Sequence, residues 1–238
     1  MTWSIIARDP DTGLIGVAVA SCAFAVGARV PFVATGVGAV ATQALENPFY
    51  GACGLDLLRG GAPAADVVRV LVEADAGREL RQVHVMDAHG RFAAHTGAAC
   101  DPWCGHLIRD TFSAAGNTLA CAAVVEETAS TFAGQSALPF PRRLLAALKA
   151  GEEAGGDRRG RQSAALLVHD AEDYPLLDIR VDDHADPLTE LARLEEVSRR
   201  RYIHYRKAMP SRANPAGIID REEIERRIAE AVARGAEP

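Results

Sequence analysis

The sequence predicts a layered α+β domain built on antiparallel sheets, followed by a helical extension. Three observations support this fold class: β-prone apolar runs at both ends of the core, helical segments between them, and amphipathic segments after them. A doubly wound parallel sheet, in which strands and helices alternate, does not fit this order. We expect one domain over residues 1–182 and a helical extension over residues 183–238.

The chain opens with a predicted β-hairpin. Two apolar, β-prone runs, residues 2–8 and 14–21, flank the turn residues Asp9-Pro10-Asp11-Thr12-Gly13. The apolar, glycine-punctuated stretch 30–43 predicts one or two buried strands before the turn signal Asn47-Pro48. Helical spacing of apolar residues over 54–59 and 63–74 then predicts two helices.

The second half of the core contains two more predicted hairpins. Residues 82–87 and 91–97 flank a short loop that ends in glycine. Small residues dominate 117–125, and their pattern does not distinguish a strand from a helix. A helix over 142–150 leads into a charged, glycine-rich loop. The buried strand 162–169 and the half-exposed strand 176–183 follow as the last hairpin.

The last part of the chain is predicted to be helical. Residues 187–209 have the pattern of one long amphipathic helix, and residues 218–235 have that of another. Such helices pack either on their own domain or on a second subunit. We expect a homo-oligomer, specifically a dimer.

Composition narrows the classes of partner. The net charge is −6 and the pI is about 5.7, so the chain lacks the basic surface that binds nucleic acid or anionic membranes. No apolar run approaches the roughly 20 residues that span a bilayer, and no secretory signal is visible, so we expect a cytoplasmic protein. The five cysteines indicate reduced thiols rather than a disulfide framework. A small polar molecule is the expected substrate.

Thr2 is the first candidate for chemistry. Removal of Met1 would leave a hydroxyl nucleophile and a free α-amine on one residue. An α-amine has a pKa near 8, so at neutral pH part of it is free to accept the hydroxyl proton. The alternative is that threonine is simply a good strand former. The rigid strand that begins at Thr2 favours the catalytic interpretation.

A second candidate is the charged loop of residues 155–163, at the start of a buried strand. Its guanidinium groups are suited to bind a substrate carboxylate, although a solvated turn would have the same composition. The polar residues of this loop are Asp157, Arg158, Arg159, Arg161, Gln162 and Ser163. Of these, Asp157, Arg159 and Gln162 are our candidates for binding substrate.

Further polar residues are candidates for binding an oxyanion or substrate. Gln43, Asn47 and Tyr50 surround a turn, although Asn-Pro is also ordinary turn chemistry. Ser21 ends the second predicted strand, and Asn117 follows a glycine.

His95, Cys100, Cys104 and His106 have the ligand types that zinc prefers, but their spacing matches no usual zinc motif. His95 alone would instead line a pocket or lie in the core. We expect neither a metal nor a cofactor.

Several segments together resemble a known family, the domain of unknown function numbered 1028 (DUF1028), which is related to the N-terminal-nucleophile hydrolases. The matching segments lie in the family's order over residues 2 to about 168. They are TWSIIARDPDTGLIGVAVAS, GVGAVATQALENPFYG, ELRQVHVMDAHGRFAAHTGAAC, Trp103-x-Gly105-His106, Gly116-Asn117-x-Leu119 and GGDRRGRQSAALLV. Cys104 and Thr128 depart from the family pattern, and the first departure weakens the zinc interpretation.

The resemblance implies a four-layer αββα sandwich of two antiparallel sheets, whose first strand carries the nucleophile. It also implies hydrolysis of an amide-type C–N bond other than a peptide bond, with Thr2 as nucleophile. A ureido, carbamoyl or N-acyl acid is the preferred substrate class, because the arginine loop would pair with its carboxylate. Two alternatives stay open: a metal-dependent hydrolase that uses the histidine and cysteine cluster, and a non-catalytic binding or assembly module.

Overall fold

The computed structural model describes residues 2–234, and the chain divides into two compact units, Met1–Leu191 and Ala192–Pro238. The first unit contains two antiparallel sheets. The six-stranded sheet has the order β10-β9-β2-β1-β8-β7, with β1 Thr2–Arg8, β2 Ile15–Ser21, β7 Gly105–Ile108, β8 Phe112–Asn117, β9 Ser163–His169 and β10 Leu177–Val181. The four-stranded sheet has the order β3-β4-β5-β6, with β3 Pro31–Ala34, β4 Gly38–Ala44, β5 Arg81–Asp87 and β6 Phe92–Thr96.

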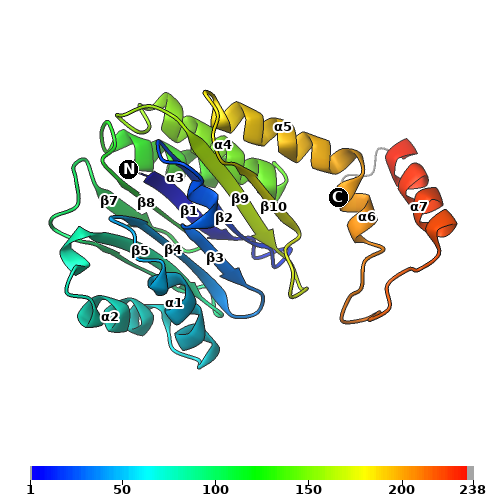
Figure 1. Ribbon diagram of the computed structural model, residues 1–238, viewed down its shortest axis with the longest axis horizontal. Coiled ribbons are helices and arrows are strands. Elements are labelled where there is room, and N and C mark those ends of the chain that lie inside the picture. The colour runs from blue at the N-terminus through cyan, green and yellow to red at the C-terminus, as the bar shows by residue number, and fades with distance from the viewer. Residues whose placement is uncertain (1, 235–238) are drawn as a thin grey trace. The chain divides into compact units, whose positions relative to one another are not determined.

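The two sheets pack against each other, and a pair of helices covers the outer face of each (Figure 1). Helices α1 (Phe49–Arg59) and α2 (Ala64–Ala74) lie on the four-stranded sheet, and α3 (Ala123–Gly134) and α4 (Phe140–Glu153) lie on the six-stranded sheet. Short 3₁₀ helices span Val26–Ala28 and Arg78–Leu80. This arrangement confirms the predicted four-layer αββα sandwich.

The layer between the two sheets changes from apolar to polar along β1. Successive residues of a strand point to opposite faces, so Thr2, Ser4 and Ile6 share one face of β1. Ile6 belongs to an apolar cluster between the sheets, which also contains Val17, Val19, Ala39, Ala41 and Met86. At Ser4 and Thr2 the same layer becomes polar, although both residues are buried. The N-terminal end of β1 is therefore a buried polar region inside an otherwise apolar sandwich.

The predicted central strands are confirmed. Strand β1 has the predicted bounds, while β2 and β9 each begin one residue later than predicted. The stretch 30–43 contains two strands, β3 and β4. Helix α1 begins at Phe49, earlier than predicted, because the Asn47 side chain accepts the Phe49 N–H at 3.1 Å.

The prediction of one long helix over residues 187–209 is wrong. Helix α5 spans Pro187–Arg200 and α6 spans Tyr202–Arg206. The chain leaves helical geometry at Arg201, whose φ is −149°, and the guanidinium of Arg201 forms two bonds to the Glu225 carboxylate. Helix α7 (Arg221–Ala233) begins at Asp220, whose side chain caps it. None of the helices over residues 2–234 combines the length and the apolar character needed to cross a membrane.

Candidate functional site

Thr2 begins β1, one of the two central strands of the six-stranded sheet, with β2 on one side and β8 on the other. In the β1–β8 register Thr2 lies opposite Asn117, the last residue of β8. Its Oγ1 lies 3.1 Å from the Oγ of Ser21, the last residue of β2. Both hydroxyl residues are buried. The ends of three neighbouring strands therefore determine where the Thr2 side chain lies.

Two side-chain amides hold the main chain of Thr2. Gln43 Nε2, from β4 of the opposite sheet, and Asn117 Nδ2 each donate to the Thr2 carbonyl at 3.3 Å. The structure thus brings together Thr2 and three of the residues predicted from the sequence: Ser21, Gln43 and Asn117. Since one bond comes from each sheet, the orientation of the first peptide unit depends on how the two sheets pack.

Gln82, on β5, sets the orientation of both amides. Its Oε1 accepts from Gln43 Nε2 at 2.7 Å and from Asn117 Nδ2 at 3.1 Å. Its Nε2 lies at 2.9–3.0 Å from three acceptors, which fixes which end of the Gln82 amide is oxygen. These acceptors are Thr96 Oγ1, Gly105 O and Gly116 O. Each of the two clamping NH₂ groups consequently has two acceptors, the Thr2 carbonyl and Gln82.

A buried histidine extends this network behind Gln43. Ser4 Oγ donates to Gln43 Oε1 at 2.6 Å and lies 2.9 Å from His84 Nε2, while His84 Nδ1 lies 2.6 Å from Ser113 Oγ. Because the Ser4 proton is used on Gln43, His84 Nε2–H must donate to Ser4, and Nδ1 must accept from Ser113. Burial lowers the pKa of His84 to about 3, so the ring is neutral in the folded protein.

The neutral state of His84 predicts a loss of stability in mild acid. An unfolded histidine has a pKa near 6.5. Below pH 6.5 His84 is protonated in the unfolded chain but stays neutral in the folded protein. The free energy of unfolding therefore decreases as the pH falls from 6.5 toward 3. The slope is about 1.4 kcal/mol per pH unit, or roughly 2 kcal/mol between pH 6.5 and 5. We expect His84→Gln to lack this part of the decline when urea unfolding is measured at pH 7.5 and 5.0. An equal decline in both proteins would contradict it.

A cavity of about 190 Å³ adjoins this network. Asn117 lines it, together with Ala44, Leu45, Leu80, Ala99, Cys100, Asp101 and Thr118. Two of these residues have left-handed backbone conformations, Ala44 with φ 73° and Thr118 with φ 52°. Such conformations are costly for residues other than glycine, especially for β-branched threonine, and they concentrate at functional sites. The cavity is therefore the candidate place for a substrate to approach Thr2.

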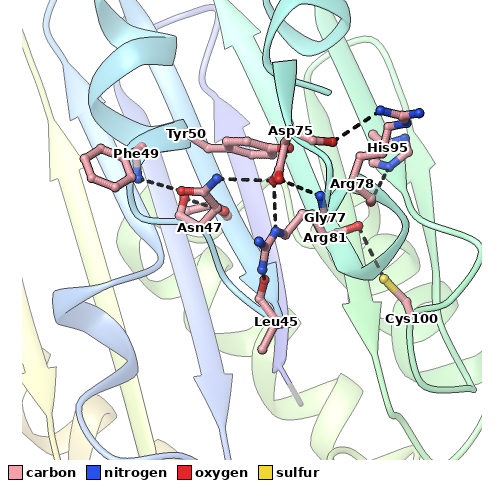
Figure 2. Close-up of polar contacts among 11 residues, drawn as sticks. Leu45, Asn47, Phe49, Tyr50, Asp75, Gly77, Arg78, Arg81, His95 and Cys100 are labelled. Carbon is pink, nitrogen blue, oxygen red and sulfur yellow. Dashed lines mark hydrogen bonds and ion pairs between the residues drawn. The ribbon is translucent and has the colours of Figure 1, made fainter. Parts of the chain in front are cut away.

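Asn47 and Tyr50 lie in a different cluster, which Figure 2 shows. Asn47 Nδ2 and the Tyr50 hydroxyl both donate to Asp75 Oδ2, at 3.2 and 3.0 Å, and Arg81 Nε binds the same oxygen at 2.9 Å. The Arg81 bond, ahead of the other donors, holds the pKa of Asp75 well below its usual range. Burial and the bond to Asp75 raise the pKa of Tyr50. These two predicted oxyanion donors are committed to a carboxylate of their own chain.

The four residues of the possible zinc cluster also bond to their own chain. His95 Nε2 lies 3.0 Å from the Arg78 carbonyl, and the Cys100 thiol donates to the Arg81 carbonyl (Figure 2). Cys104 and His106 contact Cys100 O and Thr96 Oγ1, respectively. Within residues 2–234, no group of three or more His, Cys, Asp or Glu side chains is placed to hold a metal ion.

The charged loop supports the end of β2. The buried Asp157 carboxylate accepts the Cys22 N–H and the Arg159 N–H, each at 2.8 Å. The Gln162 N–H donates to the Ser21 carbonyl at 3.1 Å. Arg159 pairs with Asp157, and Arg161 pairs with Glu152 and Asp186. The loop therefore fixes the backbone next to Ser21, and its paired arginines face carboxylates of the same chain.

Sequence reasoning missed four residues of the buried network: Ser4, Gln82, His84 and Ser113. A signal was present in β5, where Gln82 and His84 alternate with Val83 and Val85. Polar residues at alternate positions of a wholly buried strand must find partners on the facing sheet. That pattern would have identified Gln82 and His84 as buried polar residues, though not their partners.

The fold and site define a class of protein: a two-sheet αββα sandwich with a buried polar centre at the start of its first strand. The chain belongs to the family of unknown function DUF1028, whose model matches residues 2–191. It is 35% identical to protein SPO2555 from Silicibacter pomeroyi, of the same family, with a TM-score of 0.86 over 92% of this chain and 96% of that chain. Anbu (ancestral β-subunit) from Yersinia bercovieri is 12% identical, with a TM-score of 0.37 over 82% and 94% of the two chains. No curated protein matches the chain.

Proposed function

We propose that this chain is a hydrolase of the N-terminal-nucleophile type, which cleaves an amide-type C–N bond of a small polar substrate with Thr2. One observation supports this most directly. Thr2 starts a central strand, is buried between the sheets, has its hydroxyl 3.1 Å from Ser21, and has its carbonyl held by two amides. These contacts hold the hydroxyl and the first peptide unit in a fixed relation, as a nucleophile with its own amine as base requires.

The proposed reaction begins when cleavage of the peptide bond before Thr2 leaves a free α-amine. This amine, with a pKa near 8, accepts the Thr2 hydroxyl proton, and Oγ1 attacks the substrate carbonyl carbon. The protonated amine then gives its proton to the leaving nitrogen, the C–N bond breaks, and an ester to Thr2 Oγ1 remains. Water attacks that ester while the amine accepts a proton from the water. The bond from Oγ1 to the acyl carbon then breaks, the amine returns this proton to Oγ1, and the acid product leaves.

The charged loop gives less support to the finer substrate class, a ureido, carbamoyl or N-acyl acid. That class depends on a loop arginine pairing with a substrate carboxylate, but Arg159 and Arg161 already have carboxylate partners. A substrate carboxylate would have to compete with those pairs. The support for a small amide comes instead from the cavity of about 190 Å³ beside Asn117, which is below the roughly 300–1,000 Å³ of sites for drug-sized ligands.

The proposal is tested by the state of the N-terminus. We expect intact-mass measurement and N-terminal sequencing of natively expressed protein to find Thr2 as the first residue. A β-lactone, which acylates activated hydroxyl groups, should form one ester adduct, located on the N-terminal peptide by mass spectrometry. The control Thr12→Ala removes an exposed turn threonine and should not change the labelling. An active preparation that fully retains residues before Thr2 would overturn the mechanism.

A further inference from the structure

The cavity lies at the ends of two strands, next to the residues that hold Thr2. Ala44 and Leu45 directly follow Gln43 at the end of β4, and Thr118 directly follows Asn117 at the end of β8. A volume of about 190 Å³ corresponds to roughly six water molecules at about 30 Å³ each. A group of four to six heavy atoms therefore fills it.

Asn117 offers this cavity an acceptor rather than a donor. Both hydrogens of its NH₂ group are directed at acceptors, the Thr2 carbonyl and Gln82 Oε1. This assignment leaves Oδ1 as the spare atom of a residue that lines the cavity. In the part of the chain that the structure describes, Thr118 Oγ1 alone approaches this oxygen, at the long distance of 3.5 Å. Because Asn117 is buried, its carbonyl oxygen is expected to accept a hydrogen bond, and a ligand in the cavity would supply a donor.

Asp101 adds a negative charge to the same lining. Its main-chain carbonyl accepts the Thr118 N–H at 2.8 Å, which fixes the residue at the cavity. No ion pair joins its carboxylate to another residue among positions 2–234. Asp101 is also the one ionised side chain among the described residues that line the cavity.

The two arginines that flank the lining residue Leu80 do not neutralise this charge. Arg81 binds Asp75 and the Leu45 carbonyl, and Arg78 binds the Asp75 carbonyl and pairs with Glu79 (Figure 2). The Cys100 thiol donates to the Arg81 carbonyl. The donors that surround the cavity are thus used inside the chain. The Asp101 carboxylate forms no ion pair within residues 2–234, and Asn117 Oδ1 has only the long contact with Thr118 Oγ1.

We propose that this cavity binds a primary ammonium group on the substrate of the Thr2 reaction, with Asp101 as its anionic partner and Asn117 Oδ1 as a second acceptor. This inference rests on the proposed function and narrows its substrate class to small amides that carry an amine. An ammonium group has three donors and no acceptor, which complements such a lining, whereas a carboxylate there would face like charge.

The test compares three probes of similar size that differ in charge: 4-aminobutyramide (cationic), succinamide (neutral) and succinamate (anionic). Calorimetric binding to Thr2→Ala, which cannot turn over, should rank 4-aminobutyramide first by roughly threefold or more, because Asp101 is exposed and an exposed ion pair is only modestly stabilising. Adding Asp101→Lys should reverse the order in favour of succinamate. Adding Asp110→Lys, a matched change at an exposed aspartate of the β7–β8 turn, should leave the order unchanged.

Equal binding of the three probes, a preference for succinamate, an unchanged order in Asp101→Lys, or no binding at all would each overturn the inference. Its failure is distinguishable from failure of the proposed function. Labelling of Thr2 without a charge preference would refute only the ammonium site. A clear preference for 4-aminobutyramide in a protein whose Thr2 is never labelled would refute only the nucleophile.

Discussion

Thr2→Ala will fold normally and lose several orders of magnitude in the hydrolysis of any small amide that the wild-type protein cleaves. The change removes the attacking oxygen but keeps the α-amine and the strand, and loss of a nucleophile commonly costs that much in rate. It also removes the hydroxyl contact with Ser21, which should cost about 1 kcal/mol of unfolding free energy. Urea unfolding and turnover, measured on the same preparation, separate the two effects.

Thr2→Ser is the matched control for this prediction. Serine keeps a hydroxyl beside the α-amine, so some turnover and β-lactone labelling should survive. A folded Thr2→Ala protein that hydrolyses its substrate at the wild-type rate would show that Thr2 is not the nucleophile. The nucleophile would then have to be sought elsewhere, because His95, Cys100 and His106, the residues of the competing hypothesis, are not grouped to hold a metal ion within residues 2–234.

The long apolar strands of the fold were predictable because they are covered on both faces. Strands β1, β2 and β9 lie in the middle of the six-stranded sheet, so nearly every side chain is buried and the apolar run is uninterrupted. Strand β7 was missed for the opposite reason. It is a four-residue edge strand with His106 and Ile108 exposed, and its pairing with β8 determines its structure more than its own sequence does.

Helix α3, which was not predicted, and the break between α5 and α6, which was predicted as continuous helix, both lack local signals. Helix α3 is rich in alanine and threonine and has no sharp apolar face, so its period is weak. The break between α5 and α6 falls at Arg201, where neither glycine nor proline marks it. The pairing of Arg201 with Glu225, 24 residues later, is a tertiary contact that the pattern of residues 187–209 does not contain.

Site residues could be predicted from the sequence where their role depends on their own functional groups. They could not be predicted where their role depends on contacts between the two sheets. Thr2 was found from its own hydroxyl and amine. Asn47 and Tyr50 have the polarity of site residues. The packing of the end of α2, however, places Asp75 beside them, and its carboxylate accepts their hydrogen bonds. Gln82, conversely, became visible as a site residue only when β5 was placed opposite the end of β1.

Gln82→Leu should destabilise the protein by about 3–5 kcal/mol. Its Oε1 is the second acceptor for the NH₂ groups of both Gln43 and Asn117, so leucine leaves two buried N–H groups unpaired, each at a cost of about 1–3 kcal/mol. It also removes the donor to the carbonyls of Gly105 and Gly116. The same substitution at Gln135, an exposed residue after α3, should cost less than about 0.5 kcal/mol.

A second measurement separates positioning of Thr2 from general stability. If Gln82 orients the two amides that hold the Thr2 carbonyl, the β-lactone labelling rate of Gln82→Leu should fall even at temperatures where the variant is fully folded. Gln135→Leu should label at the wild-type rate. A Gln82→Leu protein within about 1 kcal/mol of wild type would contradict the unpaired-donor argument. A destabilised variant that still labels Thr2 at the wild-type rate would show that Gln82 supports the fold without positioning the nucleophile.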